Sequence, residues 1–186
     1  MPIAYNKVTR EWKTTVTPEE LDSNWIIDPQ FEDEAFANEI GHEYWTFDGN
    51  IIKTPTLQEY QALQKAKYQE EMWNQIKKYR DERINLGGVE VNGKWYHSDN
   101  TSRVQQIGLL LMGQNMPANL MWKTMDGTFV QMTPTLAQQV FQAAATSDMT
   151  THAVAEQHRQ QMLALEDPRN YDFKGTAPSW PPIFGE

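Results

Sequence analysis

Three polar side chains in the C-terminal third have residue types that could bind a metal: His152, Glu156 and His158. They lie in a segment with helical periodicity, and a helical zinc site needs two histidines at i and i+4 with a glutamate beside the first. Here the histidines are six residues apart, or about 600° of helical rotation, so they face different sides of a helix. A small metal-dependent hydrolase built on these residues is therefore a remote alternative, and we expect no cofactor.

The sequence also lacks the residues and motifs that other kinds of catalysis require. The chain contains no cysteine, which excludes disulfides, thiolate nucleophiles and thiolate metal sites. Serine, lysine and carboxylate nucleophile motifs are absent, and Gly87-Gly88 fits a helix stop rather than a phosphate-binding loop. We therefore predict that the protein is not an enzyme.

The net charge of −9, from 25 acidic and 16 basic side chains, is concentrated in one region. Residues 14–52, here called the acidic block, hold ten acidic residues and no Lys or Arg. These are Glu19, Glu20, Asp22, Asp28, Glu32, Asp33, Glu34, Glu39, Glu43 and Asp48. The rest of the chain is nearly neutral. An acidic excess disfavours nucleic acid and anionic membranes as partners.

The acidic block has three interpretations. It forms a solvated face, which is the simplest one, or a docking surface for a basic partner, with Glu32, Asp33 and Glu34 as candidate contacts. A carboxylate metal site is the third, but no calcium-loop pattern is present. Neither the apolar stretch around Ile107 to Met112 nor residues 1–7 has the length or pattern of a membrane span or a signal peptide, so we expect synthesis in a cytoplasm.

Tight-turn signals recur along the chain and predict hairpins. Asp-Gly lies at the centre of Trp45–Lys53 and of Trp122–Met132, and Asn-Gly lies in Val89–Tyr96. A fourth hairpin is expected from Ile3 to Thr15, before a helix start at Thr17-Pro18. These units are either a true repeat or, as we favour, reuse of the same turn chemistry.

Helical periodicity predicts two long helices and a shorter one. The first runs from about Leu57 to Asn85, after a capping box of Thr56 and Glu59. The second spans about Pro134 to Leu165, or breaks into two at Ser147-Asp148. The short helix, about Asn100 to Gln114, is expected to bury Val104, Ile107, Leu110 and Leu111.

The predicted fold class is therefore α+β, with small antiparallel hairpins attached to these helices and an extended C-terminal arm. Three regions follow: an acidic N-terminal region (1–56), a helical body with two hairpins (57–166) and the arm (167–186). Trp12, Trp45, Trp95 and Trp122 lie in hairpins that precede helices, where each is expected to pack hairpin against helix.

The arm is rich in proline and aromatic residues, unlike a flexible linker. We expect it to dock on the chain's own body or, the favoured alternative, on a neighbouring chain. The candidate partner-binding residues are Tyr171, Phe173, Trp180, Pro181, Pro182, Ile183 and Phe184.

From about Lys77 to Gln161 the order of segments resembles a known family. The segments are Arg80-Asp81-Glu82-Arg83, the hairpin at 88–96, Ser98 to Arg103, the hairpin at 122–132 and a long Ala/Gln-rich helix. They resemble a domain of unknown function found in tail-fibre and other tail-associated proteins of tailed bacteriophages. The resemblance implies no catalytic residues. Asp99, as a helix cap, and Arg103, within reach of Asp99 or the hairpin, are interpreted as structural.

The resemblance implies a non-enzymatic structural component of a phage tail or baseplate, which connects or decorates tail fibres. The alternative is a tail-fibre assembly chaperone that is not retained in the virion. The expected partners are other tail, fibre or baseplate proteins, and further copies of this chain in a homo-oligomer or multi-copy assembly. The expected location is the virion tail.

Overall fold

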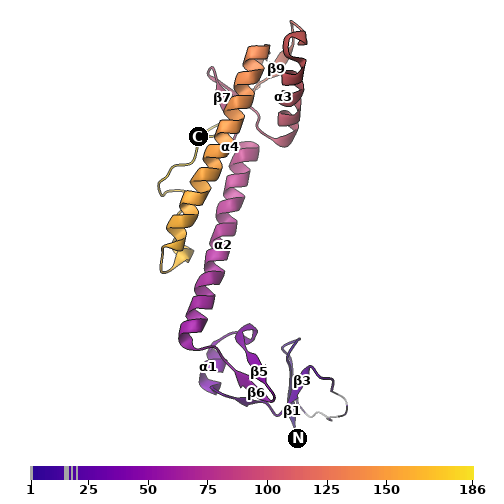
Figure 1. Ribbon diagram of the computed structural model, residues 1–186, viewed down its shortest axis with the longest axis vertical. Helices are drawn as coiled ribbons and strands as arrows, with labels where there is room; N and C mark the ends of the chain where they lie inside the picture. The colour runs from indigo at the N-terminus through magenta and orange to yellow at the C-terminus, as the bar shows by residue number, and fades with distance from the viewer. Residues whose placement is uncertain (1, 15–16, 18, 20) are drawn as a thin grey trace. The chain divides into compact units, whose positions relative to one another are not determined.

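The computed structural model describes residues 2–14, 17, 19 and 21–186 (Figure 1). The chain has the predicted α+β class, with small hairpins beside long helices. It divides into two compact units, Met1–Gln64 and Lys65–Glu186, which we describe separately. Within the described residues, none of the helices has both the length and the apolar character needed to cross a lipid bilayer.

In the first unit, strand β1 (Ile3–Asn6) pairs antiparallel with β2 (Trp12–Thr14) on one side and β3 (Trp25–Ile27) on the other. The β1–β2 pair is the expected N-terminal hairpin. Its loop is longer than a tight turn, with Asn6 Oδ1 accepting from the amides of Val8 and Thr9. A helix start was expected at Thr17-Pro18, of which Pro18 lies outside the described residues.

A second sheet in this unit contains the Asp-Gly hairpin. Strand β6 (Ile51–Lys53) lies between β5 (Thr46–Asp48), which is antiparallel to it, and β4 (Gln30–Phe31), which is parallel. Helix α1 (Glu34–Glu39) is capped by Asp33, whose carboxylate accepts from the amide of Phe36, and η2 (His42–Tyr44) follows. The sequence did not predict β3, β4 or α1, because each is too short to show a period.

Helix α2 (Leu57–Leu86) begins with the predicted capping box. The amide of Glu59 donates to Thr56 Oγ1 at 3.3 Å, and the amide of Thr56 donates to Glu59 Oε2 at 2.8 Å. The helix ends at Gly87-Gly88, where Gly88 has a φ of +71° that glycine tolerates without a steric penalty.

The second unit contains two hairpins. Strands β7 (Val89–Val91) and β8 (Lys94–Tyr96) are joined by Asn92-Gly93, both with positive φ, as a tight two-residue turn requires. Strands β9 (Met121–Lys123) and β10 (Phe129–Gln131) form the other. The amide of Met125 donates to the carbonyl of Trp95 at 2.8 Å, and this bond joins the two hairpins.

Helix α4 (Pro134–Leu163) is continuous, so the alternative of a break at Ser147-Asp148 is wrong. Thr133 caps it, and Pro134 occupies the first turn. The Asp148 carboxylate does not cap a new helix, because it bonds instead to Arg103. The short η4 (Pro168–Asn170) follows α4.

Helix α3 (Asn100–Met112), followed by η3 (Gly113–Asn115), packs beside the first half of α4 (Figure 1). The predicted burial of Val104, Ile107 and Leu111 is wrong, because all three are exposed. The helix turns Gln106 and Leu109 inward instead. The Gln106 side chain is buried and donates from Nε2 to the carbonyl of His97 at 2.9 Å, which orients that face towards the protein.

Buried side chains of the second unit form two clusters. One joins the hairpins and α3 to α4, and its buried members are Val89, Tyr96, Leu109, Met116, Met132, Ala137, Val140 and Ala144. The other joins α2, α4 and the arm, and its buried members are Met72, Ile76, Val154, Ala155, Met162, Phe173 and Trp180.

Candidate functional site

The C-terminal arm is packed against the helices of its own chain. Phe173 and Trp180 are only 8% and 9% exposed and belong to the cluster between α2 and α4. Trp180 Nε1 donates to the carbonyl of Phe173 at 2.7 Å, so the indole is buried with its polar atom satisfied. As the chain is folded here, these two side chains are unavailable to a partner.

A buried histidine lies beneath the arm. His158 of α4 is fully buried, stacks on the Trp180 ring and places Nδ1 2.7 Å from the hydroxyl of Tyr171. That hydroxyl donates its single hydrogen to Gln161 Oε1, so it accepts from His158 Nδ1–H. Burial lowers the pKa of His158. The imidazole is therefore a neutral structural group.

An arginine anchors the end of the arm. Arg83 of α2 is buried and makes a two-point ion pair with Glu186, with both N–O distances 2.7 Å. It also donates to the carbonyl of Pro181 at 2.6 Å and to the hydroxyl of Tyr79 at 2.9 Å. The bonds with Glu186 raise the pKa of Arg83 and lower the pKa of Glu186.

The arm follows the end of α2 closely at Gly87. The amide of Phe184 donates to the Gly87 carbonyl, and a Cβ at Gly87 would lie about 2.4 Å from Ile183 Cγ2. Sequence reasoning identified Gly87 only as a helix stop and did not identify Arg83 as an anchor. The sequence signal that could have identified this anchor is Arg83 itself, a basic residue in the last turn of α2, just before Gly87-Gly88.

The remaining candidate residues of the arm keep some accessible surface. Phe184 is 40% exposed, with its ring 6.1 Å from that of Trp95. Pro181 and Pro182 line a groove of about 380 Å³ with residues of β7, β8 and α4. Partner binding by this outer part of the arm remains a prediction.

The acidic block is solvent-exposed wherever the structure describes its carboxylates. The candidate contacts Glu32, Asp33 and Glu34 are all exposed, and Asp33 also caps α1. Of the block's described acids, Asp48 alone forms an ion pair with a described residue, namely Lys53 at 2.8 Å. This surface could therefore present its negative charge to a partner.

Of the four tryptophans expected to pack hairpins against helices, Trp12 is 40% exposed and lies instead beside the strand residues Tyr5 and Phe31. The other three lie in different environments. Trp45 is buried beside Tyr5 and Ile52, and its Nε1 donates to the carbonyl of Ala37 in α1 at 3.3 Å. Trp122 is half-buried against the cluster that contains the α4 residues. Trp95 is half-buried beside the arm.

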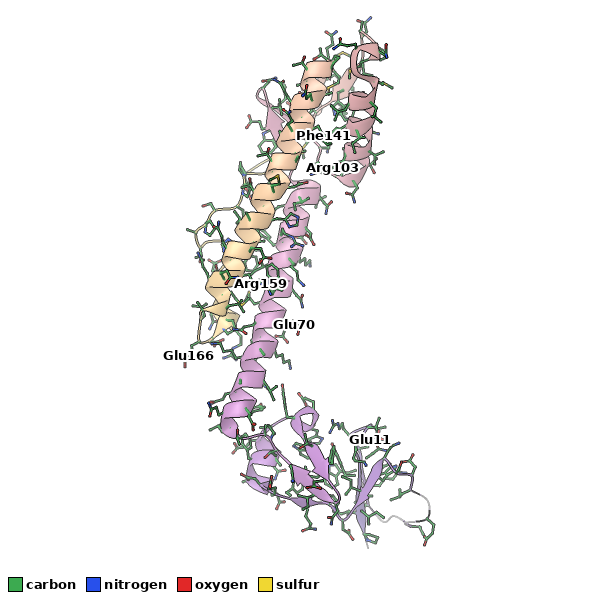
Figure 2. All side chains as sticks on the ribbon, in the orientation of Figure 1. Glu11, Glu70, Arg103, Phe141, Arg159 and Glu166 are labelled. Carbon is green, nitrogen blue, oxygen red and sulfur yellow. The ribbon has the colours of Figure 1, made fainter. Side chains whose placement is uncertain are left out.

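Asp99 and Arg103 together fix the start of α3. The Asp99 carboxylate accepts from the amide and the hydroxyl of Ser102 at 3.0 and 2.6 Å, and these bonds lower the pKa of Asp99. Arg103 donates to the carbonyl of Ser98 at 2.6 Å and to Asp148 of α4 at 2.8 Å. Arg103 was expected within reach of Asp99 or the hairpin; its side chain instead bonds to Ser98 and Asp148, and Figure 2 shows Arg103 on α3.

The possible metal ligands are not brought together. His152 and Glu156 are exposed on α4, Glu156 lies 3.4 Å from Arg159, and His158 is buried on another side. Over the described part of the chain, no group of His, Asp or Glu side chains has an arrangement suited to a metal ion.

Comparison with known families assigns the second unit. Residues 67–175 match the family described as Domain of unknown function (DUF4376). This match covers more than half of the 186 residues, so the chain belongs to that family. No curated protein and no solved structure shows a significant match. The predicted resemblance to a domain of unknown function is thereby confirmed, and its association with phage tails remains a prediction.

Proposed function

We propose that the protein is a non-enzymatic structural component of a bacteriophage tail or baseplate, which connects or decorates tail fibres through protein–protein contacts. The segment order from Lys77 to Gln161 supports this proposal through its resemblance to tail-associated proteins. The proposal needs surfaces for partners rather than a catalytic pocket.

The observation that carries the proposal is the exposed acidic block. A carboxylate-rich surface with few cations of its own attracts a basic protein surface, speeds association and disfavours acidic partners. The family domain at residues 67–175 contains none of this block. The block would therefore give this chain a binding specificity that the family domain alone does not provide.

Protein mass spectrometry of purified virions tests the proposal. The chain should be present in intact particles at a constant ratio to known tail proteins, and remain through density-gradient purification that removes adsorbed host protein. Absence from purified particles, with presence in infected cells bound to fibre subunits, would favour the assembly chaperone and overturn the structural role.

A further inference from the structure

Helix α3 carries an apolar stripe on the side that faces away from α4. Val104, Ile107 and Leu111 are 70%, 44% and 83% exposed. Their spacing of three and four residues places them on one helical face, opposite the buried Gln106 and Leu109. Exposed apolar side chains that gather on one face make a candidate interaction site.

Gly108 lies in the middle of this stripe. A Cβ built there would meet no atom of the chain within 4 Å, so packing within the chain does not require glycine. Glycine inside a helix is unfavourable by about 1 kcal/mol relative to alanine. What glycine permits at this point is close approach of another backbone.

The surroundings of the stripe carry no charge. Residues 104–122 and 127–147, which include α3, η3 and the first half of α4, contain no Asp, Glu, Lys or Arg. The nearest charge on α3, Arg103, is already paired with Asp148. Phe141 on α4, 36% exposed, lines a groove beside Leu110, and Figure 2 shows it on the same end of the unit as α3.

We propose that this face binds the same face of a second copy of the chain, with the two α3 helices crossing near Gly108. In a two-fold symmetric contact each residue near the axis lies close to its own twin, so any charge there would face a like charge. A surface without charge, with glycine at its centre and heptad-like apolar spacing on either side, meets these conditions. The proposal does not depend on the role in a phage tail.

The area available fits a weak, reversible dimer. At roughly 100 Å² for each fully exposed aliphatic side chain, the stripe with the neighbouring Met112 presents about 250 Å² of apolar surface. With a polar rim of glutamines, the total buried by two copies is on the order of 1,000 Å², which is the lower end for specific interfaces. We therefore expect a dissociation constant between about 1 and 100 µM.

Sedimentation velocity on the full-length protein over a concentration series tests the proposal. The wild type should shift from monomer to dimer with rising concentration. Leu111→Glu, which places a carboxylate near its twin, should weaken the dimer at least about 10-fold. Leu86→Glu is the matched control, because Leu86 is a 73% exposed leucine at the end of α2 and should leave the dimer unchanged.

Two further variants separate a loss of dimer from a loss of fold. A Cβ at Gly108 meets nothing in its own chain, and leucine favours the helix over glycine. The melting temperature of Gly108→Leu should therefore be equal or higher, while its dimer weakens. An equimolar mixture of Leu111→Glu and Leu111→Lys should associate more strongly than either variant alone. A wild type that stays monomeric at several times the upper bound of 100 µM would overturn the proposal. So would a dimer that tolerates both Leu111→Glu and Gly108→Leu.

Discussion

At the scale of single residues, we expect the buried pair of His158 and Tyr171 to affect how the stability of the protein responds to acid. The imidazole donates through Nδ1, and its Nε2 has no hydrogen-bond partner among the described residues. Adding a proton to Nε2 would therefore place a positive charge on a buried imidazole, where water cannot solvate it. Burial is the main reason that the pKa of His158 is lowered, with the backbone of Pro178 and then the charge of Asp172 acting in the opposite direction.

The predicted consequence is a loss of stability below pH 6.5. The unfolded chain titrates this histidine near its ordinary pKa of about 6.5, so it binds more protons than the folded chain between that pH and the lowered value. The free energy of unfolding should fall by up to about 1.4 kcal/mol per pH unit in this window. Urea unfolding at pH 7.5, 6.5, 6.0 and 5.5 measures this slope.

A matched pair of variants assigns the slope to His158. His158→Gln should be less stable at pH 7.5 but lose the slope, whereas His152→Gln, at an exposed position of the same helix, should keep it. An unchanged slope in His158→Gln would show that another group controls the acid response.

At the scale of elements, the arm is part of the fold of the second unit. It contributes Phe173 and Trp180 to the cluster between α2 and α4, and Arg83 holds its end by the ion pair with Glu186. In Figure 2, Arg159 of α4 is directed towards α2, where its guanidinium lies 4.9 Å from the ring centre of Trp73. The arm therefore completes a helix pair that already packs.

Substitution of two aromatic residues of the arm tests its energetic role. Trp180→Ala should lower the free energy of unfolding by about 3–5 kcal/mol, because a buried aromatic ring leaves a cavity. Phe184→Ala, at a 40% exposed position four residues later, should cost about 1 kcal/mol or less. Thermal and urea unfolding measure both.

The same measurements also show whether the arm packs on its own chain or on a neighbouring one. Equal, small effects of both substitutions would show that the arm does not pack on its own chain. If Trp180 were instead docked on a neighbouring chain, the melting temperature of the wild type would rise with protein concentration.

At the scale of the whole molecule, the charge is divided between the two units. The residues from Met1 to Gln64 hold 12 acids and 4 bases, and those from Lys65 to Glu186 hold 13 acids and 12 bases. The first unit therefore has a net charge of −8 and the second −1. The proposed docking to a basic partner would therefore use the first unit, and the proposed contact between two copies would use the second.

Neutralising part of the acidic block should reduce incorporation into particles. We predict that Glu32→Gln combined with Glu34→Gln and Glu39→Gln lowers the amount of the chain in purified virions several-fold, since these exposed carboxylates would face a basic partner. Asp33 is left intact because it caps α1. Quantitative mass spectrometry of virions measures the effect.

The control carries the same charge change in the second unit. Glu70→Gln, Glu71→Gln and Glu166→Gln remove three exposed carboxylates there and should leave incorporation unchanged. Equal incorporation of both triple variants would mean that the acidic block is only a solvated face.

Local signals in the sequence were sufficient for most of the secondary structure. The Asn92-Gly93 turn, the Thr56–Glu59 capping box and the Asp99 cap each act within four residues, so their chemistry can be recognised without the fold. The same holds for the acidic block, because consecutive carboxylates without cations cannot be buried together.

Only the tertiary structure decided which faces are covered. The apolar residues of α3 predicted a buried stripe, but the bond from Gln106 to His97 and the pairing of Arg103 with Asp148 turn that stripe outward. Likewise, nothing local links Arg83 to Glu186, which are 103 residues apart. Such contacts depend on where distant segments meet, and a sequence period reports only which residues of one element share a face.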